Sequence, residues 1–173
     1  MSQQKPNEQT LGLQLLKKQL SELKKSPVEG FSAGLIDDSD MFKWEAVIMG
    51  PVNTIYEGGF FKAHLVFPKE YPNKPPKMKM ISELWHPNIE NNGDVCISIL
   101  HEPGDDAFGY EKACERWLPI HTIESIVVSV ISMLSDPNDE SPANVDAAKE
   151  WRTNYPEFKK KVLKCVRKSQ EEM

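Results

Sequence analysis

Two runs of alternating apolar and polar residues constrain the fold more than any other feature of the chain. Apolar side chains occupy every second position in residues 44–48 and again in residues 61–67. Successive side chains of a β-strand point to opposite faces of a sheet, so this period indicates two strands that each bury one face. Gly50-Pro51 and Gly58-Gly59 punctuate the runs, and such short connections favour antiparallel neighbours. The sequence therefore predicts an antiparallel meander.

One further strand is expected on either side of these two. The period of two begins at Phe31, and a fourth strand is expected near Lys77–Ile81. The segment between the third and fourth strands, residues 71–76, holds prolines that cannot donate to a sheet ladder, so it should be a stiff connection. We therefore expect four strands in the meander.

Helical periodicity precedes the predicted strands. Four leucines recur at spacings of three and four, which places them on one side of a helix over residues 10–25; they are Leu13, Leu16, Leu20 and Leu23. Pro27 should end this helix. Lys17 and Lys18 lie on its other faces, where they are either solvated or part of a docking surface.

Helical periodicity returns after residue 119. Six apolar residues fall on one helical face, with Thr122 placed to cap the helix and Pro137 placed to end it; they are Ile123, Ile126, Val127, Val130, Ile131 and Leu134. Ser141-Pro142 resembles a cap followed by proline in the first turn, and Pro156 can open another helix. The predicted fold class is α+β: an N-terminal helix, a four-stranded antiparallel meander, an active-site loop and C-terminal helices.

Charge and cysteine content limit the partners and the compartment. The 173-residue chain suits one domain, and its net charge of -5 argues against general nucleic-acid binding. No apolar run approaches the length of a membrane span, and residues 1–10 lack the features of a secretory signal. Three widely spaced cysteines argue against a disulfide framework. We expect a soluble protein of the reducing cytoplasm.

An irregular stretch, residues 82–119, separates the strands from the second helix and holds the residues of chemical interest. Cys96 by itself fits either a small apolar residue in a buried strand or a nucleophile. Asp94 is its nearest charge in sequence and disfavours the thiolate that a hydrolytic cysteine needs. The histidine and cysteine spacings match no usual zinc pattern, and no phosphate-binding glycine loop occurs. We therefore expect no metal and no cofactor.

Eight short motifs occur in one order within residues 10–170. They are Met41-Phe42-Lys43-Trp44, Ile48-Met49-Gly50-Pro51, Tyr56-Glu57-Gly58-Gly59, Phe67-Pro68-Lys69-Glu70-Tyr71-Pro72, Lys74-Pro75-Pro76, His86-Pro87-Asn88, Gly93-Asp94-Val95-Cys96 and Asp136-Pro137-Asn138. Together they resemble the ubiquitin-conjugating enzyme family, although no single motif would be enough. The resemblance implies one catalytic domain over residues 10–170, preceded by a flexible N-terminus over residues 1–9.

The resemblance also implies a thioester mechanism. Cys96 would accept the C-terminal glycine of ubiquitin from the activating enzyme and hold it until a substrate lysine attacks. Asn88 would stabilise the oxyanion formed in that attack or hold the active-site loop, and the two roles do not exclude each other. His86 matches the family's structural histidine, which braces the turn through hydrogen bonds; the alternative role is a general base. The implied enzyme is a transferase without a cofactor.

Two departures from the family pattern concern the rim of the site. Ser141 stands where many relatives carry an aspartate that orients or deprotonates the incoming lysine. Trp117 follows Cys96 by 21 residues, which implies an acidic insertion over about residues 101–116. Both features resemble the long-acidic-loop branch of the family, which is associated with degradative chains and endoplasmic-reticulum quality control. The insertion is either a solvated loop or a lid whose Asp105 or Asp106 attracts the acceptor amine.

The resemblance names protein partners and the surface that would bind them. Ubiquitin, the activating enzyme, a ubiquitin ligase and a substrate protein are the implied partners, and a location in the cytoplasm with recruitment to the endoplasmic-reticulum surface or the nucleus is expected. The matching docking positions for a ligase or the activating enzyme are Lys17, Lys18, Asn73, Leu118, Pro119 and Ile120. Many relatives carry an aromatic residue where this chain has Asn73, so the choice of ligase is left open.

The other two cysteines are expected in different environments, and two other functional classes remain as alternatives. Cys165 falls on an apolar helical face and should belong to the core, whereas Cys114 should be exposed in the insertion. Two rival functions are a family member without catalytic activity, which would lack the cysteine, and a cysteine hydrolase, which would need a histidine brought beside Cys96 by folding.

Overall fold

The predicted order of one helix, four strands and C-terminal helices is the order found in a computed structural model, which describes residues 8–102 and 116–173. The elements are α1 (Glu8–Lys25), β1 (Phe31–Leu35), β2 (Lys43–Met49), β3 (Phe60–Val66), β4 (Lys77–Met80), the 3-10 turn η1 (Ser98–Leu100), α2 (Ile123–Ser135), α3 (Val145–Thr153) and α4 (Tyr155–Glu171). The α+β fold class is confirmed. The predicted flexible N-terminus falls largely on residues 1–7, which lie outside the described residues.

The four strands form one antiparallel sheet in the order β1-β2-β3-β4. Trp44 pairs with Leu65 and Ile48 pairs with Phe61, so the alternating apolar positions of β2 and β3 share one face. These four side chains are fully buried. The predicted meander and its buried face are therefore confirmed, and the fourth strand ends at Met80, one residue before the predicted end.

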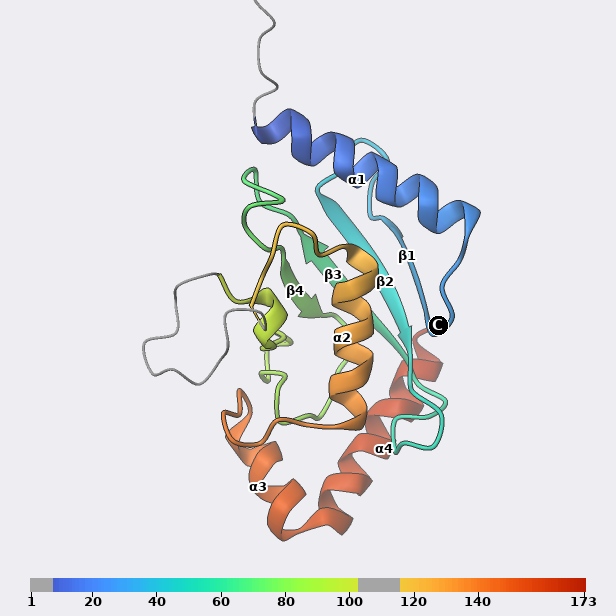
Figure 1. Cartoon of the computed structure of the whole chain (residues 1–173). Coiled ribbons are helices and arrows are strands. Elements are labelled where there is room, and N and C mark those ends of the chain that lie inside the picture. The colour runs from blue at the N-terminus through green and yellow to red at the C-terminus, as the bar shows by residue number, and fades with distance from the viewer. Residues whose placement is uncertain (1–7, 103–115) are drawn as a thin grey trace, which may run out of the picture.

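Helix α2 lies across the buried face of the sheet and closes the core (Figure 1). Ile126, Val127 and Val130 are fully buried there. Burial of an aliphatic side chain of this size stabilises the fold by about 1.5–3 kcal/mol. Since α2 is held by the sheet, the segments that enter and leave it are anchored too, and both segments border the irregular stretch that carries the motifs.

Two of the three predicted helix-start signals are found in the structure, and one is not. Thr122 caps α2 by accepting a hydrogen bond from Ser125 N, and the helix ends at Ser135, just before Pro137. Pro156 lies in the first turn of α4, also as predicted. The prediction for Ser141-Pro142 was wrong, because α3 begins at Val145 and Asn144 is its cap. The N–H groups of residues 143 and 144 donate to Pro87 O, so this segment is held as a loop until the helix starts.

Helix α1 begins at Glu8, two residues before the predicted start, and crosses one end of the sheet (Figure 1). Leu16 is fully buried, and Leu15, Leu20 and Leu23 pack against the core around it. Gln19 on this helix donates to Tyr71 Oη (2.7 Å) and accepts from the N–H of Ile123 (2.8 Å). The side chain therefore ties α1 both to the proline-rich connection and to the start of α2.

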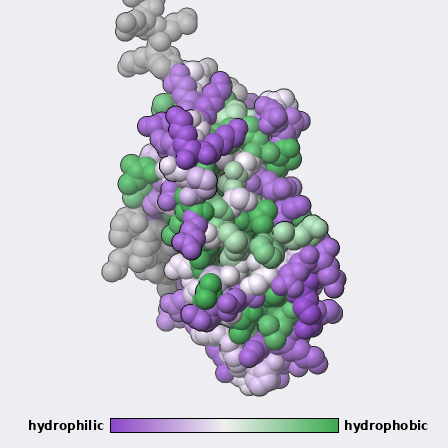
Figure 2. Space-filling view, turned by 90° about the vertical axis from the view of Figure 1, so that its right-hand side faces the viewer, coloured by the Kyte–Doolittle hydropathy of each residue, from purple (hydrophilic) through white to green (hydrophobic). Residues whose placement is uncertain are grey.

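The surface is mixed in character. Figure 2 shows one face on which hydrophobic residues gather in the middle and hydrophilic residues surround them. Exposed apolar side chains on or beside the strands include Met49, Val66 and Ile81. No helix in the described part of the chain is both long enough and apolar enough to cross a membrane.

Candidate active site

The motif cysteine lies at the end of a short hairpin, residues 88–96. Cys96 N donates to Asn88 O (2.9 Å), and Glu90 N donates to Asp94 O (2.9 Å), so the two arms are paired. Gly93 makes the turn with a φ of 100°, a left-handed conformation that favours glycine. A Cβ on Gly93 would lie 2.2 Å from Met80 O, because the hairpin also pairs with β4. The pairing with the sheet thus fixes the backbone position of Cys96.

His86 is fully buried at the base of this hairpin. Its Nδ1 accepts from the N–H of Asn88 (2.9 Å), so Nε2 carries the proton and donates to Met133 O (2.8 Å). Burial lowers the pKa of His86 from 6.5 to about 4, although the Met133 carbonyl partly offsets that effect. With both ring nitrogens engaged, the imidazole has no lone pair to offer a reacting group, and it joins the hairpin to α2.

Asn88 is buried and uses both ends of its side-chain amide. Nδ2 donates to Asn138 O (2.6 Å), and Oδ1 accepts from Asn138 N (2.9 Å). This pair of bonds holds the segment after α2 against the hairpin that carries Cys96. The arrangement corresponds to the loop-holding role, while Nδ2 retains a second hydrogen that an oxyanion in the groove could accept.

The electrostatic surroundings of Cys96 favour a protonated thiol. Sγ lies 3.9 Å from Glu90 Oε1 and is half-buried. Burial is the main cause that raises the pKa of Cys96, followed by the negative charges of Glu90 and Asp94. The effect expected from Asp94 is thus joined by a larger one from Glu90, which sequence reasoning missed because contact across a hairpin depends on its register.

Cys96 opens on a groove of about 680 Å³ between the hairpin, η1, the second half of α2 and the loop after it. Asn88 and Ser141, two of the residues predicted at the site, line it together with Asn138, whereas His86 lies at the base of the hairpin and does not line the groove. His101 and His121 line it too, yet within residues 8–102 and 116–173 neither ring is hydrogen-bonded to Sγ. Nor do the described residues contain a cluster of side chains that could hold a metal ion.

Comparisons with known proteins agree with this geometry. A model of the family described as "Ubiquitin-conjugating enzyme" matches residues 15–166. The chain belongs to the ubiquitin-conjugating enzymes. It is 69% identical over 158 residues to "Probable ubiquitin-conjugating enzyme E2 7" of Caenorhabditis elegans, covering 91% of this chain and 96% of the relative. It is 51% identical over 157 residues to "Ubiquitin-conjugating enzyme E2 G2" of Homo sapiens, covering 89% and 95%.

A solved structure of human ubiquitin-conjugating enzyme E2 G1 is similar in fold, with a TM-score of 0.65, 64% identity and coverage of 73% of this chain and 96% of that chain. The family prediction is therefore confirmed, and the E2 G-type relatives are consistent with its long-acidic-loop branch. Membership implies ubiquitin, an activating enzyme and a ubiquitin ligase as partners of this enzyme.

The acidic insertion of this ubiquitin-conjugating enzyme leaves and rejoins the domain at one place. Trp117 N donates to His101 O (3.0 Å), so the two ends of the insertion are joined by a backbone hydrogen bond beside the groove. Asp105, Asp106 and Cys114 fall within residues 103–115, outside the described residues. Their predicted roles are not tested by the structure.

The carboxylate of Asp139, in the loop after α2, is paired with an arginine. Arg152 on α3 donates from Nε to an Asp139 carboxylate oxygen and from a terminal nitrogen to the Asp139 carbonyl. This pairing uses Asp139 to attach the loop after α2 to α3. Sequence spacing gave no indication of Arg152, because the contact bridges 13 residues across a helix start.

The predicted docking residues lie on three segments that meet at one end of the molecule. Trp117 Nε1 donates to Pro72 O (2.8 Å), and Gln19 joins Tyr71 to Ile123, so α1 and the two loops are tied together. All six predicted positions are exposed, with Ile120 81% exposed; they are Lys17, Lys18, Asn73, Leu118, Pro119 and Ile120. Their role in binding a ligase or the activating enzyme stays a prediction.

Proposed function

We propose that Cys96 is the carrier of ubiquitin in this ubiquitin-conjugating enzyme. The observation that supports this most directly is the position of the thiol, which is half-buried and opens on a groove of about 680 Å³. Cys165, the other described cysteine, is only 6% exposed, and burial raises the pKa of its thiol. It therefore belongs to the core and is a poor candidate.

The surroundings of Cys96 suit storage of an acyl group rather than hydrolysis. A hydrolytic cysteine needs a neighbouring imidazole that forms the thiolate and later activates water. Here burial, followed by the negative charges of Glu90 and Asp94, raises the pKa of the thiol, and Sγ has no imidazole partner among the described residues. The thioester would form by exchange with the activating enzyme's thioester, with the Cys96 proton passing to the departing thiolate.

Asn88 and His86 complete the proposed machinery. His86 braces the hairpin by binding Met133 O and the N–H of Asn88, and Asn88 holds the segment at Asn138. A rigid hairpin keeps the thioester carbonyl in one place for lysine attack, which reduces the entropic part of the barrier. The second Nδ2 hydrogen of Asn88 would stabilise the oxyanion in that step.

A charging assay tests the carrier role. The chain is incubated with activating enzyme, ATP and ubiquitin, and an adduct that a thiol reductant cleaves is expected. Cys96→Ser should give an adduct that resists the reductant, because an oxyester replaces the thioester, while Cys114→Ser and Cys165→Ser should charge normally. A reductant-sensitive adduct on Cys96→Ala would contradict the proposal, and cleavage of ubiquitin conjugates instead of charging would indicate a hydrolase.

We further propose that the enzyme builds degradative ubiquitin chains. The support is the acidic insertion between His101 and Trp117 together with Ser141 at the rim, the two features that resemble the long-acidic-loop branch. The test is chain synthesis with a cognate ligase, followed by exposure of the products to purified proteasome. Polyubiquitinated products that the proteasome degrades are expected, whereas products limited to single ubiquitins would contradict this part of the proposal.

A further inference from the structure

Glu90 places a carboxylate against the reacting sulfur. Its backbone is fixed on both sides, because Glu90 N donates to Asp94 O (2.9 Å) and Glu90 O accepts from Gly93 N (2.9 Å). From this fixed position Oε1 reaches to 3.9 Å from Cys96 Sγ, and the side chain is half-buried. The roles proposed for Asn88 and His86 involve no carboxylate, so Glu90 is a charged group beside the thiol to which no role has been assigned.

Of the other carboxylates near Cys96, Asp136 lines the groove, and two more are engaged elsewhere. Asp94 Oδ2 accepts from Asn92 Nδ2 (3.1 Å), and Asp139 is bound by Arg152. Ser141, at the position where many relatives carry an aspartate, has no carboxylate to offer. Among the described residues, Glu90 is the carboxylate whose oxygen contacts Sγ.

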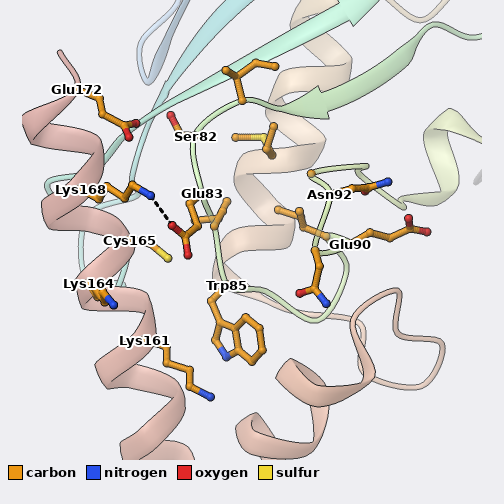
Figure 3. A pocket seen from close by; sticks show the side chains of 16 residues that line it. Ser82, Glu83, Trp85, Glu90, Asn92, Lys161, Lys164, Cys165, Lys168 and Glu172 are labelled. Atoms are coloured by element: carbon orange, nitrogen blue, oxygen red, sulfur yellow. Dashed lines mark hydrogen bonds and ion pairs between the residues drawn. The ribbon is translucent and has the colours of Figure 1, made fainter.

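Glu90 is also not neutralised by the basic residues behind the hairpin. A cavity of about 490 Å³ separates the hairpin from α4. On the α4 side this cavity is lined by Lys161, Lys164 and Lys168. Figure 3 shows the Glu90 carboxylate pointing away from these lysines, while Lys168 is bound to Glu83 (2.7 Å). Within residues 8–102 and 116–173, no lysine or arginine forms an ion pair with Glu90.

Charging of Cys96 changes what Glu90 can bind. In the free enzyme the thiol hydrogen is the donor that faces Oε1. A thioester sulfur carries no hydrogen, so the carboxylate loses this donor when ubiquitin is attached. The acceptor lysine then approaches the thioester carbonyl to within about 3–3.5 Å, and its ammonium group brings both positive charge and N–H donors beside the same carboxylate.

We propose that Glu90 is a catalytic residue that binds the ε-ammonium group of the acceptor lysine and takes its proton as the amine attacks the Cys96 thioester. The lysine nitrogen forms the new C–N bond, and the C–S bond breaks. Of the two ammonium protons lost, one passes through Glu90 to solvent and the other reprotonates the departing Cys96 thiolate. This inference rests on the proposed role of Cys96 as the ubiquitin carrier.

Single-turnover discharge tests the role of Glu90 separately from that of Cys96. The chain is charged, the activating enzyme is stopped by chelating magnesium, and the preformed thioester is mixed with free lysine or with hydroxylamine. Lysine is cationic at neutral pH, whereas hydroxylamine is a neutral amine that needs no carboxylate to bind it. Absence of a Cys96 thioester in the wild-type chain would overturn the carrier role itself, and all results on Glu90 are read from charged enzyme.

Glu90→Gln should charge but discharge to lysine at least about tenfold more slowly, since general acid-base groups contribute about 10²–10⁴-fold and this one is half-exposed. The lysine concentration at half-maximal rate should rise, and discharge to hydroxylamine should stay within about twofold of wild type. The matched control is Asp94→Asn, which removes the same charge from the same hairpin without removing the group that contacts Sγ. Its loss with lysine should be several-fold smaller.

Three results would overturn the proposal. The first is discharge of Glu90→Gln to lysine at close to the wild-type rate. The second is an equal loss of discharge rate with lysine and with hydroxylamine, which would indicate a distorted hairpin. The third is an equal loss of lysine discharge in Asp94→Asn, which would indicate a general effect of negative charge. Glu90→Asp keeps the charge but shortens the side chain. It should slow lysine discharge more than hydroxylamine discharge, and it decides the question if Glu90→Gln fails to charge.

Discussion

Acidification should destabilise the fold through His86, and the size of the effect follows from its burial. The unfolded imidazole gains a proton as the pH falls through about 6.5, whereas the folded imidazole stays neutral until about pH 4. Between these values the unfolded state binds more protons, so the free energy of unfolding decreases as the pH decreases. A pKa difference of about 2.5 units at 1.36 kcal/mol per unit amounts to about 3 kcal/mol.

The perturbation that isolates this effect is His86→Gln, which cannot titrate but retains a donor and an acceptor. Unfolding by urea, followed by tryptophan fluorescence, would be measured from pH 7.5 to pH 4.5 for both proteins. Titration of distant carboxylates is common to both and cancels in the difference. The wild type should lose about 2–3 kcal/mol more than the variant over this range. That loss is large against the 5–15 kcal/mol by which domains are usually stable.

The same experiment bears on the role of His86. The two stability curves should converge as the pH falls, because the unfolded wild type gains a proton on His86 that the buried imidazole, held by the N–H of Asn88 and by Met133 O, does not accept, whereas the variant gains none in either state. Curves that run parallel from pH 7.5 to pH 4.5 would refute the reasoning. They would mean that the buried imidazole titrates alike in the folded and unfolded states.

Three further predictions concern the hairpin, its neighbouring loop and the insertion. Asn88→Ala should charge normally but discharge to lysine about 10²–10³-fold more slowly if its amide binds the oxyanion. Arg152→Ala loosens the same neighbouring loop and serves as its control: discharge close to wild type is expected, and an equal loss would leave only the loop-holding role. Gly93→Ala should lower the free energy of unfolding in urea by at least about 2 kcal/mol, because its φ of 100° and its contact with a backbone oxygen exclude a Cβ; wild-type stability would contradict this. Asp105→Asn combined with Asp106→Asn should slow chain synthesis but not charging, with an effect that fades as salt screens exposed charges; a wild-type rate at every salt concentration would remove the electrostatic role.

The local architecture could be predicted because it depends on short-range physics. A period of two in residues 44–48 and 61–67 specified two strands and their buried face, since each side chain's direction follows from its place in the strand. Thr122 and Pro156 marked helix starts because a cap and a first-turn proline act within one helical turn. The one cap placed wrongly, at Ser141-Pro142, failed because two hydrogen bonds to Pro87 O hold that segment as a loop.

The sequence by itself also determined the family, because ordered motifs such as His86-Pro87-Asn88 and Gly93-Asp94-Val95-Cys96 are written in the chain. Only the tertiary structure decided what those residues contact. It gave His86 the carbonyl of Met133, 47 positions away, and gave Asn88 the backbone of Asn138, 50 positions away. Neither partner has a sequence signature, because backbone groups are the same at every residue and a contact between them depends on how α2 packs on the sheet. Glu90 and Cys96 meet for a related reason: they are six positions apart, and only the register of the hairpin brings carboxylate and sulfur together.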